Sequence, residues 1–255
     1  MRIDCYLTPN DVDDLGLRER TAVVIDVLRA STSIVTALGN GAKEVIPAMT
    51  VEFATKISAN LGGDVALLAG ERNGRMVPGF DLGNSPAEFA GGKIHGRSII
   101  FTSTNGSQAL VKARYAQELA VCAFVNMSAV VQLLAGRSRD FAVLCSGKEG
   151  GFSLEDTVCA GMLISRVVDT LDHEVSLSDA AVAAMALHKA LGRGLLKMMK
   201  NSEHGRFLEE IGFGDDLRLC AQIDTVPVVP LLDAGVLRLK RTEARPEPVT
   251  QSMHR

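Results

Sequence analysis

Polar side chains that can bind or transfer a charged group follow short apolar runs at five places. They are Asp26 with Arg29, Glu71 with Arg72, the stretch Thr102-Ser103-Thr104-Asn105-Gly106, Asn126, and Ser146-Gly147-Lys148. The apolar runs are typical of buried strands, and ligands of open α/β sheets bind beyond the carboxyl ends of the strands. Several of these residues also precede expected helices, whose free backbone N–H groups favour an anion such as phosphate. The pattern predicts an anion site along one edge of a sheet.

Carboxylates are expected to gather on the same side of the sheet. The candidates are Asp26, Glu71, Asp81, Glu155 and Asp156. Several carboxylates beside Arg, Lys and a helix N-terminus are explained if a hard cation such as Mg²⁺ lies between protein and phosphate. The residues therefore predict a phosphoryl-transfer site that holds a divalent cation and an oxyanion together. They leave open which of the carboxylates bind the cation.

The stretch GERNGRMVPGFDLGNSP, residues 70–86, is long for a loop in a compact domain, which points to function. Its Gly and Pro residues are expected to shape the backbone. Glu71 and Arg72 would then stay near a strand end while Asp81, Asn84 and Ser85 fold back towards it. The Asn-Ser-Pro end of the stretch is also expected to cap a short helix, with Pro86 in the first turn.

Each of these features also has a purely structural explanation. Asp26 fits a charge at a helix N-terminus, TSTNGS a strand-to-helix turn, and Ser153-x-x-Asp156 a capping box. His204, taken alone, fits a surface residue at the start of a helix. Motifs of better-known enzymes are missing: the sequence has no cysteine-phosphatase loop, no D-x-D at Asp26, no P-loop and no G-x-S-x-G elbow. The coincidence of strand ends is what favours function.

Composition excludes several classes of protein. The chain has 255 residues, a formal net charge of −3, 4% aromatic residues and no Trp, which argues against nucleic acid as a partner. No apolar run is long enough for a membrane span, and the first ten residues lack the apolar segment of a secretory signal. Five scattered cysteines without a C-x-x-C pattern fit reduced thiols. We therefore expect a cytoplasmic protein with no membrane or nucleic-acid partner.

Apolar runs that alternate between strand and helix lengths predict a three-layer α/β sandwich around a mainly parallel, possibly mixed sheet. Strands are expected at 21–26, 44–48, 65–70, 97–102, 118–124 and 141–146. Helices are expected at 31–41, 51–63, 105–114, 126–136 and 154–171. The region 172–222 is predicted to be more helical, with helices at 178–192, 193–200 and 203–211.

The end of the chain is expected to contribute less to the sheet. The run 226–239 contains two proline residues, so we predict that it adds an edge strand. Residues 1–240 are predicted to form one domain, and residues 241–255 a disordered tail. The Ala-rich helix at 180–192 is expected to pack inside the fold, with a homodimer contact as the alternative.

Six sequence blocks occur in an order that resembles a known family. They are VVIDVLRASTSIVTAL (23–38), GERNG (70–74), GFDLGNSP (79–86), TSTNGS (102–107), CSGKEGGFSLEDTVCAG (145–161) and SEHGRFLEEIGFGDDLRLCAQID (202–224). The blocks are similar to those of the 2-phosphosulfolactate phosphatases, whose usual TTTNGT block is TSTNGS here. The resemblance implies a three-layer α/β fold and a Mg²⁺-dependent acid phosphatase. Its substrate would be 2-phospho-3-sulfolactate, which it would cleave to 3-sulfolactate and phosphate, in archaeal methanogens a step of coenzyme M biosynthesis.

Placed in such an enzyme, the polar residues take the following expected roles. The expected catalytic residues are Asp26, His204 and Arg29: Asp26 is the nucleophile or the base that activates water, His204 donates a proton to the leaving alkoxide, and Arg29 pairs with phosphate, sulfonate or carboxylate oxygens. Substrate oxygens are bound by Arg72, Ser85, Thr102, Thr104, Asn105, Gly106, Ser146 and Lys148. A covalent aspartyl-phosphate and direct attack by water both remain open. So do two other functions: a phosphatase for another small 2-phospho-acid, and a non-catalytic protein that binds a small anion.

Overall fold

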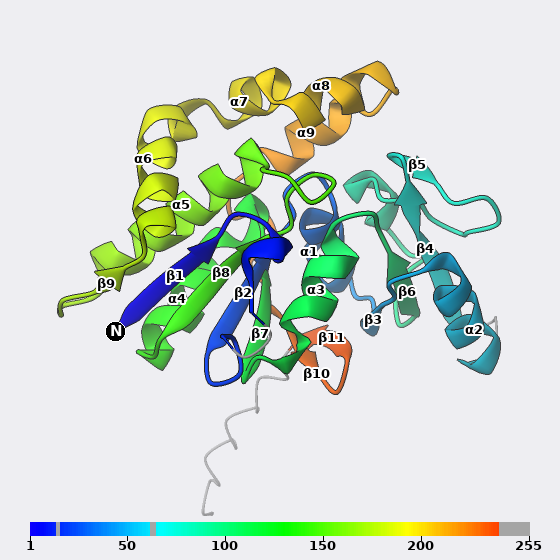
Figure 1. Ribbon diagram of the computed structural model, residues 1–255. Helices are drawn as coiled ribbons and strands as arrows, with labels where there is room; N and C mark the ends of the chain where they lie inside the picture. Colours follow the sequence, from blue (N-terminus) through cyan, green and yellow to red (C-terminus); the bar gives the residue numbers. More distant parts are fainter. Residues whose placement is uncertain (14–15, 62–64, 240–255) are drawn as a thin grey trace, which may run out of the picture.

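The computed structural model describes residues 1–13, 16–61 and 65–239 (Figure 1). The expected tail therefore lies outside the described residues. The strands are β1 (Arg2–Tyr6), β2 (Thr21–Ile25), β3 (Glu44–Pro47), β4 (Ala66–Arg72), β5 (Arg75–Met76), β6 (Ser98–Thr102), β7 (Glu118–Cys122), β8 (Phe141–Cys145), β9 (Ser176–Leu177), β10 (Pro230–Asp233) and β11 (Val236–Leu239). The helices are α1 (Ala30–Gly39), α2 (Val51–Leu61), α3 (Gly106–Lys112), α4 (Met127–Arg137), α5 (Leu154–Thr170), α6 (Asp179–Leu191), α7 (Leu195–Asn201), α8 (Glu203–Glu210) and α9 (Gly214–Cys220).

Within the described residues, one mixed sheet has the strand order β5-β4-β6-β3-β11-β10-β7-β2-β8-β1-β9. Strands β9, β1, β8, β2 and β7 form one parallel group, and β3, β6 and β4 form a second. The hairpin β10–β11 pairs antiparallel with β7 on one side and with β3 on the other. Two parallel groups are thus joined by one antiparallel hairpin.

Helices cover both faces of the sheet, which confirms the predicted three-layer α/β sandwich. Along β2, Val23 and Ile25 pack against α4 and α5, whereas Ala22 and Val24 pack against α1 and α3. This alternation follows from the strand period of two. Elsewhere in the sheet, α2 packs on β4 and β6. Helices α7–α9 cover one end of the molecule (Figure 1). The C-terminal part is helical as expected, with α9 as an additional helix.

The run 226–239 does not form an edge strand, so that prediction was wrong. It forms the hairpin at the centre of the sheet. The proline argument fails because Pro230 is the first residue of β10, opposite Leu239 at the end of β11. At the first position of a strand, a missing N–H removes no ladder hydrogen bond from the interior.

Close backbone approach at Gly70 starts the long stretch 70–86. Gly70 has φ 149°, and a Cβ there would lie 2.0 Å from the carbonyl oxygen of Thr102 on β6. Only glycine allows this contact between β4 and β6. The chain then turns tightly at Asn73 and Gly74, both with positive φ, into β5. Glu71 is therefore fixed beside the carboxyl end of β6.

The Ala-rich helix packs against α5 with one face only, so the expected interior packing holds for that face. Ala181 and Ala184 of α6 are buried against α5, where a Cβ on Gly161 would lie 2.0 Å from the carbonyl oxygen of Ala184. The outer face of α6, through which a homodimer contact would form, exposes Val182. None of the described helices combines the length and apolar character needed to cross a bilayer.

Candidate functional site

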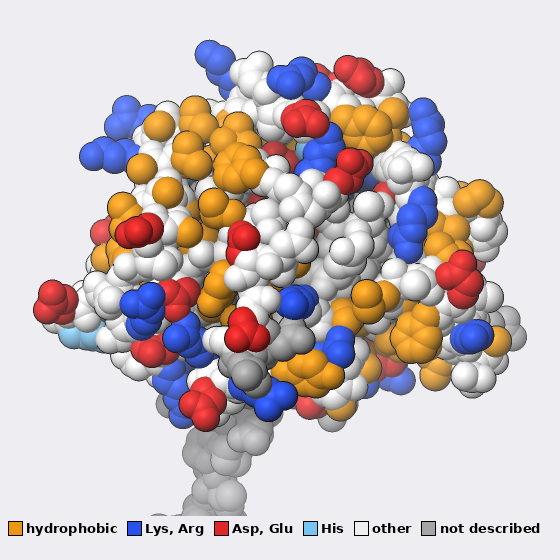
Figure 2. Space-filling view, in the orientation of Figure 1, with side chains coloured by type: hydrophobic (Ala, Val, Ile, Leu, Met, Phe, Trp, Pro, Cys, Tyr) orange, Lys and Arg blue, Asp and Glu red, His pale blue; other side chains and the backbone are white. Residues whose placement is uncertain are grey.

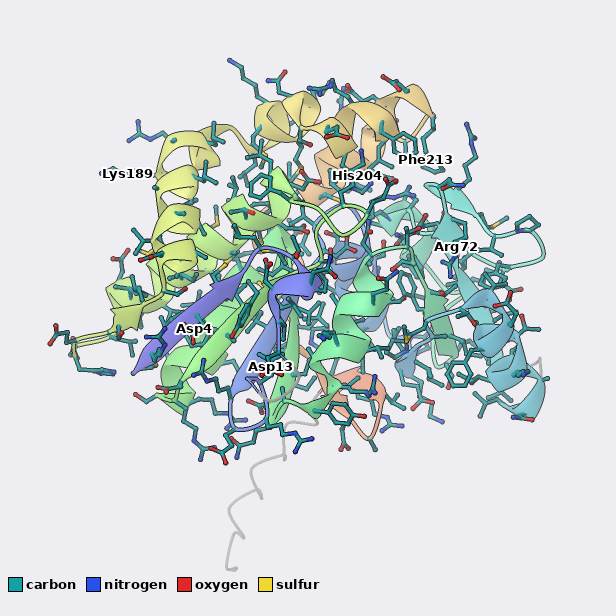
Figure 3. All side chains as sticks on the ribbon, viewed as in Figure 1. Asp4, Asp13, Arg72, Lys189, His204 and Phe213 are labelled. Carbon is teal, nitrogen blue, oxygen red and sulfur yellow. The ribbon has the colours of Figure 1, made fainter. Side chains whose placement is uncertain are left out.

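Four of the five predicted strand ends supply residues to one cleft of about 220 Å³. These are Asp26 after β2, Glu71 at the end of β4, Thr104 and Asn105 after β6, and Lys148 after β8, and His204 of α8 closes the other side. Figure 3 shows His204 below α8, with Arg72 further out beside β4. The fifth strand end does not contribute, because the buried Asn126 side chain bonds the backbone of Ala123, Val121 and Val228 instead.

Asp26 lies at the bottom of the cleft and is only 5% exposed. Its carboxylate accepts one backbone hydrogen bond, from Ala30 at the start of α1. Burial raises the pKa of Asp26 from its ordinary 3.8 to about 6, against the opposing charge of His204. A Cβ on Gly106 would lie 2.6 Å from Asp26 Oδ2, so a glycine is required at that position to keep the carboxylate accessible.

Glu71 is the most strongly held carboxylate in the cleft. Its Oε1 accepts a hydrogen bond from Thr104 N at 2.7 Å, and its Oε2 accepts from Gly74 N at 2.8 Å and Thr104 Oγ1 at 3.3 Å. The bonds join the β4–β5 turn to the loop after β6. Glu71 therefore shapes the cradle in which we predicted phosphate to bind, and it keeps a carboxylate charge beside Asp26.

Asp156 and Ser146 are brought near the cleft but hold backbone segments together. Asp156 accepts hydrogen bonds from Val27 N at 2.8 Å, Ser146 Oγ at 3.1 Å and Gly147 N at 3.2 Å. Burial, followed by the charges of Asp26 and Glu155, raises the pKa of Asp156 well above its ordinary value. Ser153 caps α5 through the Asp156 N–H, as a capping residue should. Neither Asp156 nor Ser146 lines the cleft, so these contacts favour an anchoring role over the predicted metal and substrate roles.

Three other candidates lie outside the cleft. Asp81 accepts a hydrogen bond from Leu68 N, which holds its carboxylate on the outer side of β4. Arg72 donates to the Glu71 carbonyl and to Thr102 Oγ1, so these two predicted substrate ligands satisfy each other. The structure gives no support for Asp81 as a metal ligand, or for Arg72 and Thr102 as direct substrate contacts. Their hydrogen bonds hold the ends of the strands in place instead.

Arg29 lines the cleft and is held in a buried network that sequence reasoning missed. Its Nη1 donates to Asp216 Oδ2 at 2.7 Å and its Nη2 to the Gly74 carbonyl at 2.6 Å, and its guanidinium carbon lies 4.3 Å from the centre of the Phe213 ring. Ser85, a predicted substrate ligand, instead donates to Asp216 Oδ1 at 2.5 Å. The network fixes the direction in which Arg29 faces the cleft.

Replacing Asp216 by Asn should weaken both binding and folding. Removing one partner of a buried ion pair costs about 3–5 kcal/mol, so we expect the free energy of unfolding to fall by a few kcal/mol. A less fixed Arg29 should raise KM for an anionic substrate by about tenfold or more. The neighbouring Asp215→Asn is a matched control, because the Asp215 side chain is fully exposed. Chemical denaturation and steady-state kinetics measure both effects, and equal behaviour of the two variants would contradict the assignment.

Two further candidates are tethered at the mouth of the cleft. Lys148 Nζ lies 2.6 Å from Glu203 Oε1 on α8, a carboxylate whose side chain is 79% exposed. Asn105 Oδ1 accepts from Glu149 N, which ties the loop after β6 to the loop after β8. An incoming anion can compete with an exposed carboxylate for Lys148, so this pair is compatible with the predicted role in substrate binding.

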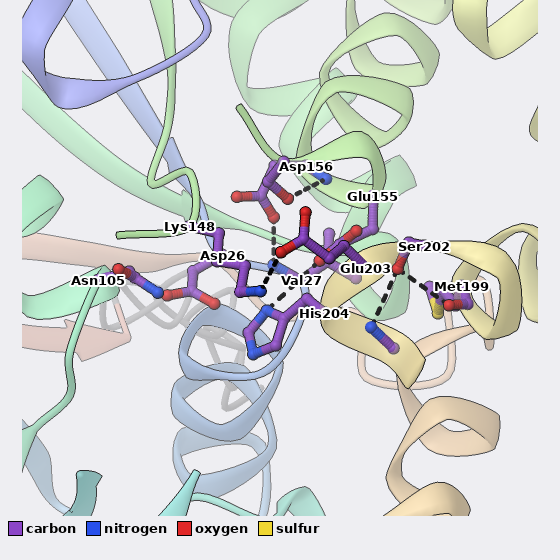
Figure 4. A network of polar contacts seen from close by, with 12 residues as sticks. Asp26, Val27, Asn105, Lys148, Glu155, Asp156, Met199, Ser202, Glu203 and His204 are labelled. Atoms are coloured by element: carbon purple, nitrogen blue, oxygen red, sulfur yellow. Dashed lines mark hydrogen bonds and ion pairs between the residues drawn. The ribbon is translucent and has the colours of Figure 1, made fainter. Parts of the chain in front are cut away.

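Glu155 does not lie among the cleft carboxylates but behind His204. Its Oε1 is 3.5 Å from His204 Nδ1 and has no hydrogen-bond partner. Figure 4 shows this pair beside Asp26 and Asp156, with Ser202 at the start of α8. Burial raises the pKa of Glu155, but the interaction with the nearby His204 outweighs it and the net effect is a lowered pKa. Glu155 is thus an ionised carboxylate directed at the histidine.

The cleft fits a magnesium ion only if the substrate completes its coordination. In the parts of the chain that the structure describes, no group of three or more His, Cys, Asp and Glu side chains is arranged as a metal site. Mg²⁺ is commonly held by one or two carboxylates together with water and substrate phosphates. Asp26 and Glu71 both line the cleft and meet that requirement. A cation would also offset the lining carboxylates, because the lining basic side chains Arg29, Lys148 and His204 are each paired with another carboxylate.

Comparison with known proteins identifies the family. The family model of 2-phosphosulpholactate phosphatase matches residues 6–235. The chain belongs to this family. A relative from Caldanaerobacter subterraneus subsp. tengcongensis, named "Probable 2-phosphosulfolactate phosphatase", is 41% identical over 93% of this chain and 98% of its own length. Relatives with the same name in Symbiobacterium thermophilum and Clostridium beijerinckii are 39% and 32% identical, over 86% and 90% of this chain. The matched regions cover 94% and 96% of the lengths of these two relatives.

Family membership agrees with the resemblance carried by the six blocks. The 2-phosphosulfolactate phosphatase match includes the four strand ends, α8 and α9, and so covers the whole cleft. It also includes Phe213 and Asp216, which no short motif singled out. On the face of the molecule that Figure 2 shows, positive, negative and apolar side chains are intermixed.

Proposed function

We propose that this member of the family hydrolyses 2-phospho-3-sulfolactate to 3-sulfolactate and phosphate with the help of Mg²⁺. The observation that carries the proposal is the cleft in which Asp26, Glu71, Thr104, Lys148 and His204 meet. Its volume of about 220 Å³ suits a small substrate, since drug-sized ligands occupy about 300–1,000 Å³. We also expect the enzyme to act in the cytoplasm, since all five cysteines are buried free thiols.

Charge supports the need for a cation. Asp26, Glu71 and Glu149 line the cleft, whereas the basic side chains there are already paired with other carboxylates: Arg29 with Asp216, Lys148 with Glu203, and His204 with Glu155. A phosphate ester that also carries a carboxylate and a sulfonate would be repelled by this excess of negative charge. Asp26 and Glu71 would hold the Mg²⁺, which would supply positive charge to offset that of the phosphate oxygens.

The side chains have separate tasks in this reaction. The loop of Thr104, which is held by Glu71, and the amide of Asn105 form the phosphate cradle, and Gly106 leaves room for it beside Asp26. Arg29 and Lys148 pair with the remaining substrate oxygens. The Asp26 carboxylate either attacks phosphorus or takes the proton of an attacking water, and His204 protonates the leaving alkoxide.

A panel of substrates tests the proposal. The pure protein is assayed for phosphate release from 2-phospho-3-sulfolactate, 2-phospholactate, 2-phosphoglycerate and a simple alkyl phosphate, each with Mg²⁺. We expect kcat/KM to be highest for phosphosulfolactate. If another small 2-phospho-acid is preferred, the substrate is that acid and the site assignments stand. Binding of these esters without any phosphate release would contradict catalysis and favour an anion-binding protein.

A further inference from the structure

Glu155 has an environment that is costly for a carboxylate. It lies in the first turn of α5 and is 1% exposed, with the apolar side chains of Val158 and Cys159 in the next turn. Its Oε1 is one of two buried side-chain polar atoms without a hydrogen bond among the described residues. An ionised group buried in this way costs several kcal/mol unless it is paired. The nearest charged partner is His204 Nδ1, 3.5 Å away.

The histidine is held rigidly on the other side of this pair. Ser202 caps α8 by accepting a hydrogen bond from Gly205 N and donates to the carbonyl of Met199 (Figure 4). A Cβ on Gly205 would lie 1.8 Å from that same carbonyl oxygen, so α7 and α8 meet with no space between them. The His204 ring also packs near Phe207, with 6.2 Å between the ring centres. Its Nδ1 therefore has a fixed direction, towards Glu155.

We infer that Glu155 is a positioning residue that keeps the proton of His204 on Nδ1 and thereby makes Nε2 the atom that donates to the leaving group. The inference rests on the proposed function. A carboxylate accepts a hydrogen bond from only one nitrogen of the ring, and that bond decides the tautomer. With Nδ1 directed into the protein, Nε2 is the nitrogen left for the cleft. The arrangement removes Glu155 from the set of metal ligands and gives it a role through His204.

The proton balance of the step follows from this pairing. The P–O bond to the substrate carbon skeleton breaks, and its electron pair stays on the leaving oxygen. His204, protonated on both nitrogens, gives its Nε2 proton to that oxygen. The ring then becomes the neutral Nδ1–H form, and its Nδ1 still faces Glu155. Phosphorus gains an oxygen from water, and the proton released by that water restores Nε2. The products are the alcohol and inorganic phosphate.

A general acid matters most when the leaving group is poor. The alkoxide of a hydroxy acid is a poor leaving group, whereas 4-nitrophenolate leaves without a proton. The Glu155–His204 pair therefore indicates that the substrates of this site are phosphate esters of aliphatic alcohols. General acid catalysis typically contributes about 10²–10⁴-fold in rate, so its loss should be confined to substrates of that class.

Two variants test the inference on two substrates. For His204→Gln we expect kcat on 2-phospholactate to fall by about 10²–10⁴-fold, and on 4-nitrophenyl phosphate by less than about tenfold. For Glu155→Gln we expect the same selectivity with a smaller loss, about 10–100-fold on 2-phospholactate. If Glu155→Gln fails to fold, Glu155→Asp replaces it in the same two assays. Glu209→Gln, at the far end of α8 in an ion pair with Lys200, is the matched control and should leave both rates unchanged.

A second readout does not depend on turnover. In protein labelled with ¹⁵N-histidine, the resonances of His204 are identified by their loss in His204→Gln, and in wild type at high pH they should report the Nδ1–H tautomer. Glu155→Gln should shift the ring towards a tautomer mixture. Equal rate losses on both substrates, or an unchanged tautomer, would overturn the inference. Absence of phosphate release by wild type from every ester would instead contradict the proposed function, and the tautomer experiment would still decide the role of Glu155.

Discussion

Asp26→Asn should abolish phosphate release and at the same time stabilise the protein. The carboxylate is the expected nucleophile or base, so we expect kcat to fall by at least about 10³-fold. The amide can still accept the hydrogen bond from Ala30 N, so the fold around α1 should be preserved. Activity falls because a charge is lost at the bottom of the cleft, not because the site unfolds.

The gain in stability follows from the raised pKa of Asp26. The unfolded chain releases this proton near 3.8 and the folded protein near 6, so folding is favoured at low pH and disfavoured by ionisation. Without metal, the free energy of unfolding should fall by up to about 3 kcal/mol as pH rises from about 4 to about 6. Asp26→Asn removes this loss. In EDTA at pH 7.5 we expect the variant to be more stable by about 1–3 kcal/mol, as measured by urea unfolding.

Asp4→Asn is the matched control because the pKa of Asp4 is shifted in the opposite direction to that of Asp26. Burial raises the pKa of Asp4, but hydrogen bonds and ion pairs with Arg2 and Arg20 outweigh it and hold that pKa below its ordinary value. Such a carboxylate stabilises the fold above its unfolded pKa and loses that effect as pH falls. Asp4→Asn should therefore reduce stability and keep activity. An Asp26→Asn protein that is active, or that is less stable than wild type in EDTA, would contradict the assignment of Asp26.

Chelation of divalent metal should remove nearly all activity, and Mg²⁺ should restore it. The basic residues that line the cleft are each paired with another carboxylate and leave the lining carboxylates unbalanced, so an anionic ester is not expected to bind the metal-free cleft productively. We expect less than about 1% of the rate in EDTA, which corresponds to roughly 3 kcal/mol of transition-state stabilisation. Mg²⁺ should also raise the apparent stability, by about 2.7 kcal/mol at 100 times its Kd.

The midpoint of Mg²⁺ activation separates the ligands from other buried carboxylates. Glu71→Gln should move the midpoint to higher Mg²⁺ by tenfold or more, roughly 1.4 kcal/mol. Glu44→Gln should leave it unchanged, because Glu44 is a buried carboxylate that pairs with Ser98 and Arg238 far from the cleft. Full activity in EDTA, with metal content below about 0.1 ion per chain, would exclude a metal-dependent reaction.

The strand ends were predictable from sequence because their signal is local. Asp26, Glu71, Thr104, Asn105 and Lys148 each follow an apolar run of strand length, and all five line the cleft. Parallel strands must bring their carboxyl ends together, so an alternating pattern already places such residues. The same rule failed for Asn126, since an amide after a strand is equally suited to bonding nearby backbone.

The supporting residues were not predictable, because burial and pairing depend on distant segments. Asp215 and Asp216 are adjacent acids at the start of α9 and look alike in sequence, yet one is exposed and the other holds Arg29. Asp81 was expected to fold back to the cleft, but its carboxylate satisfies Leu68 N nearby. Glu155 was grouped with metal ligands by charge alone, whereas its direction is set by α8, some fifty residues later in the chain.

The hairpin β10–β11 follows every other described strand in the sequence, yet it lies at the centre of the sheet. Without residues 230–239, the parallel groups that carry Asp26 on one side and Glu71 and Thr104 on the other have no strand between β7 and β3 to join them. The contacts that complete the sheet are therefore among the longest in sequence separation, and such contacts form late in folding. Each parallel group can form separately, but the two halves of the cleft meet only when the hairpin lies between them. The cleft is therefore among the last parts of the molecule to form.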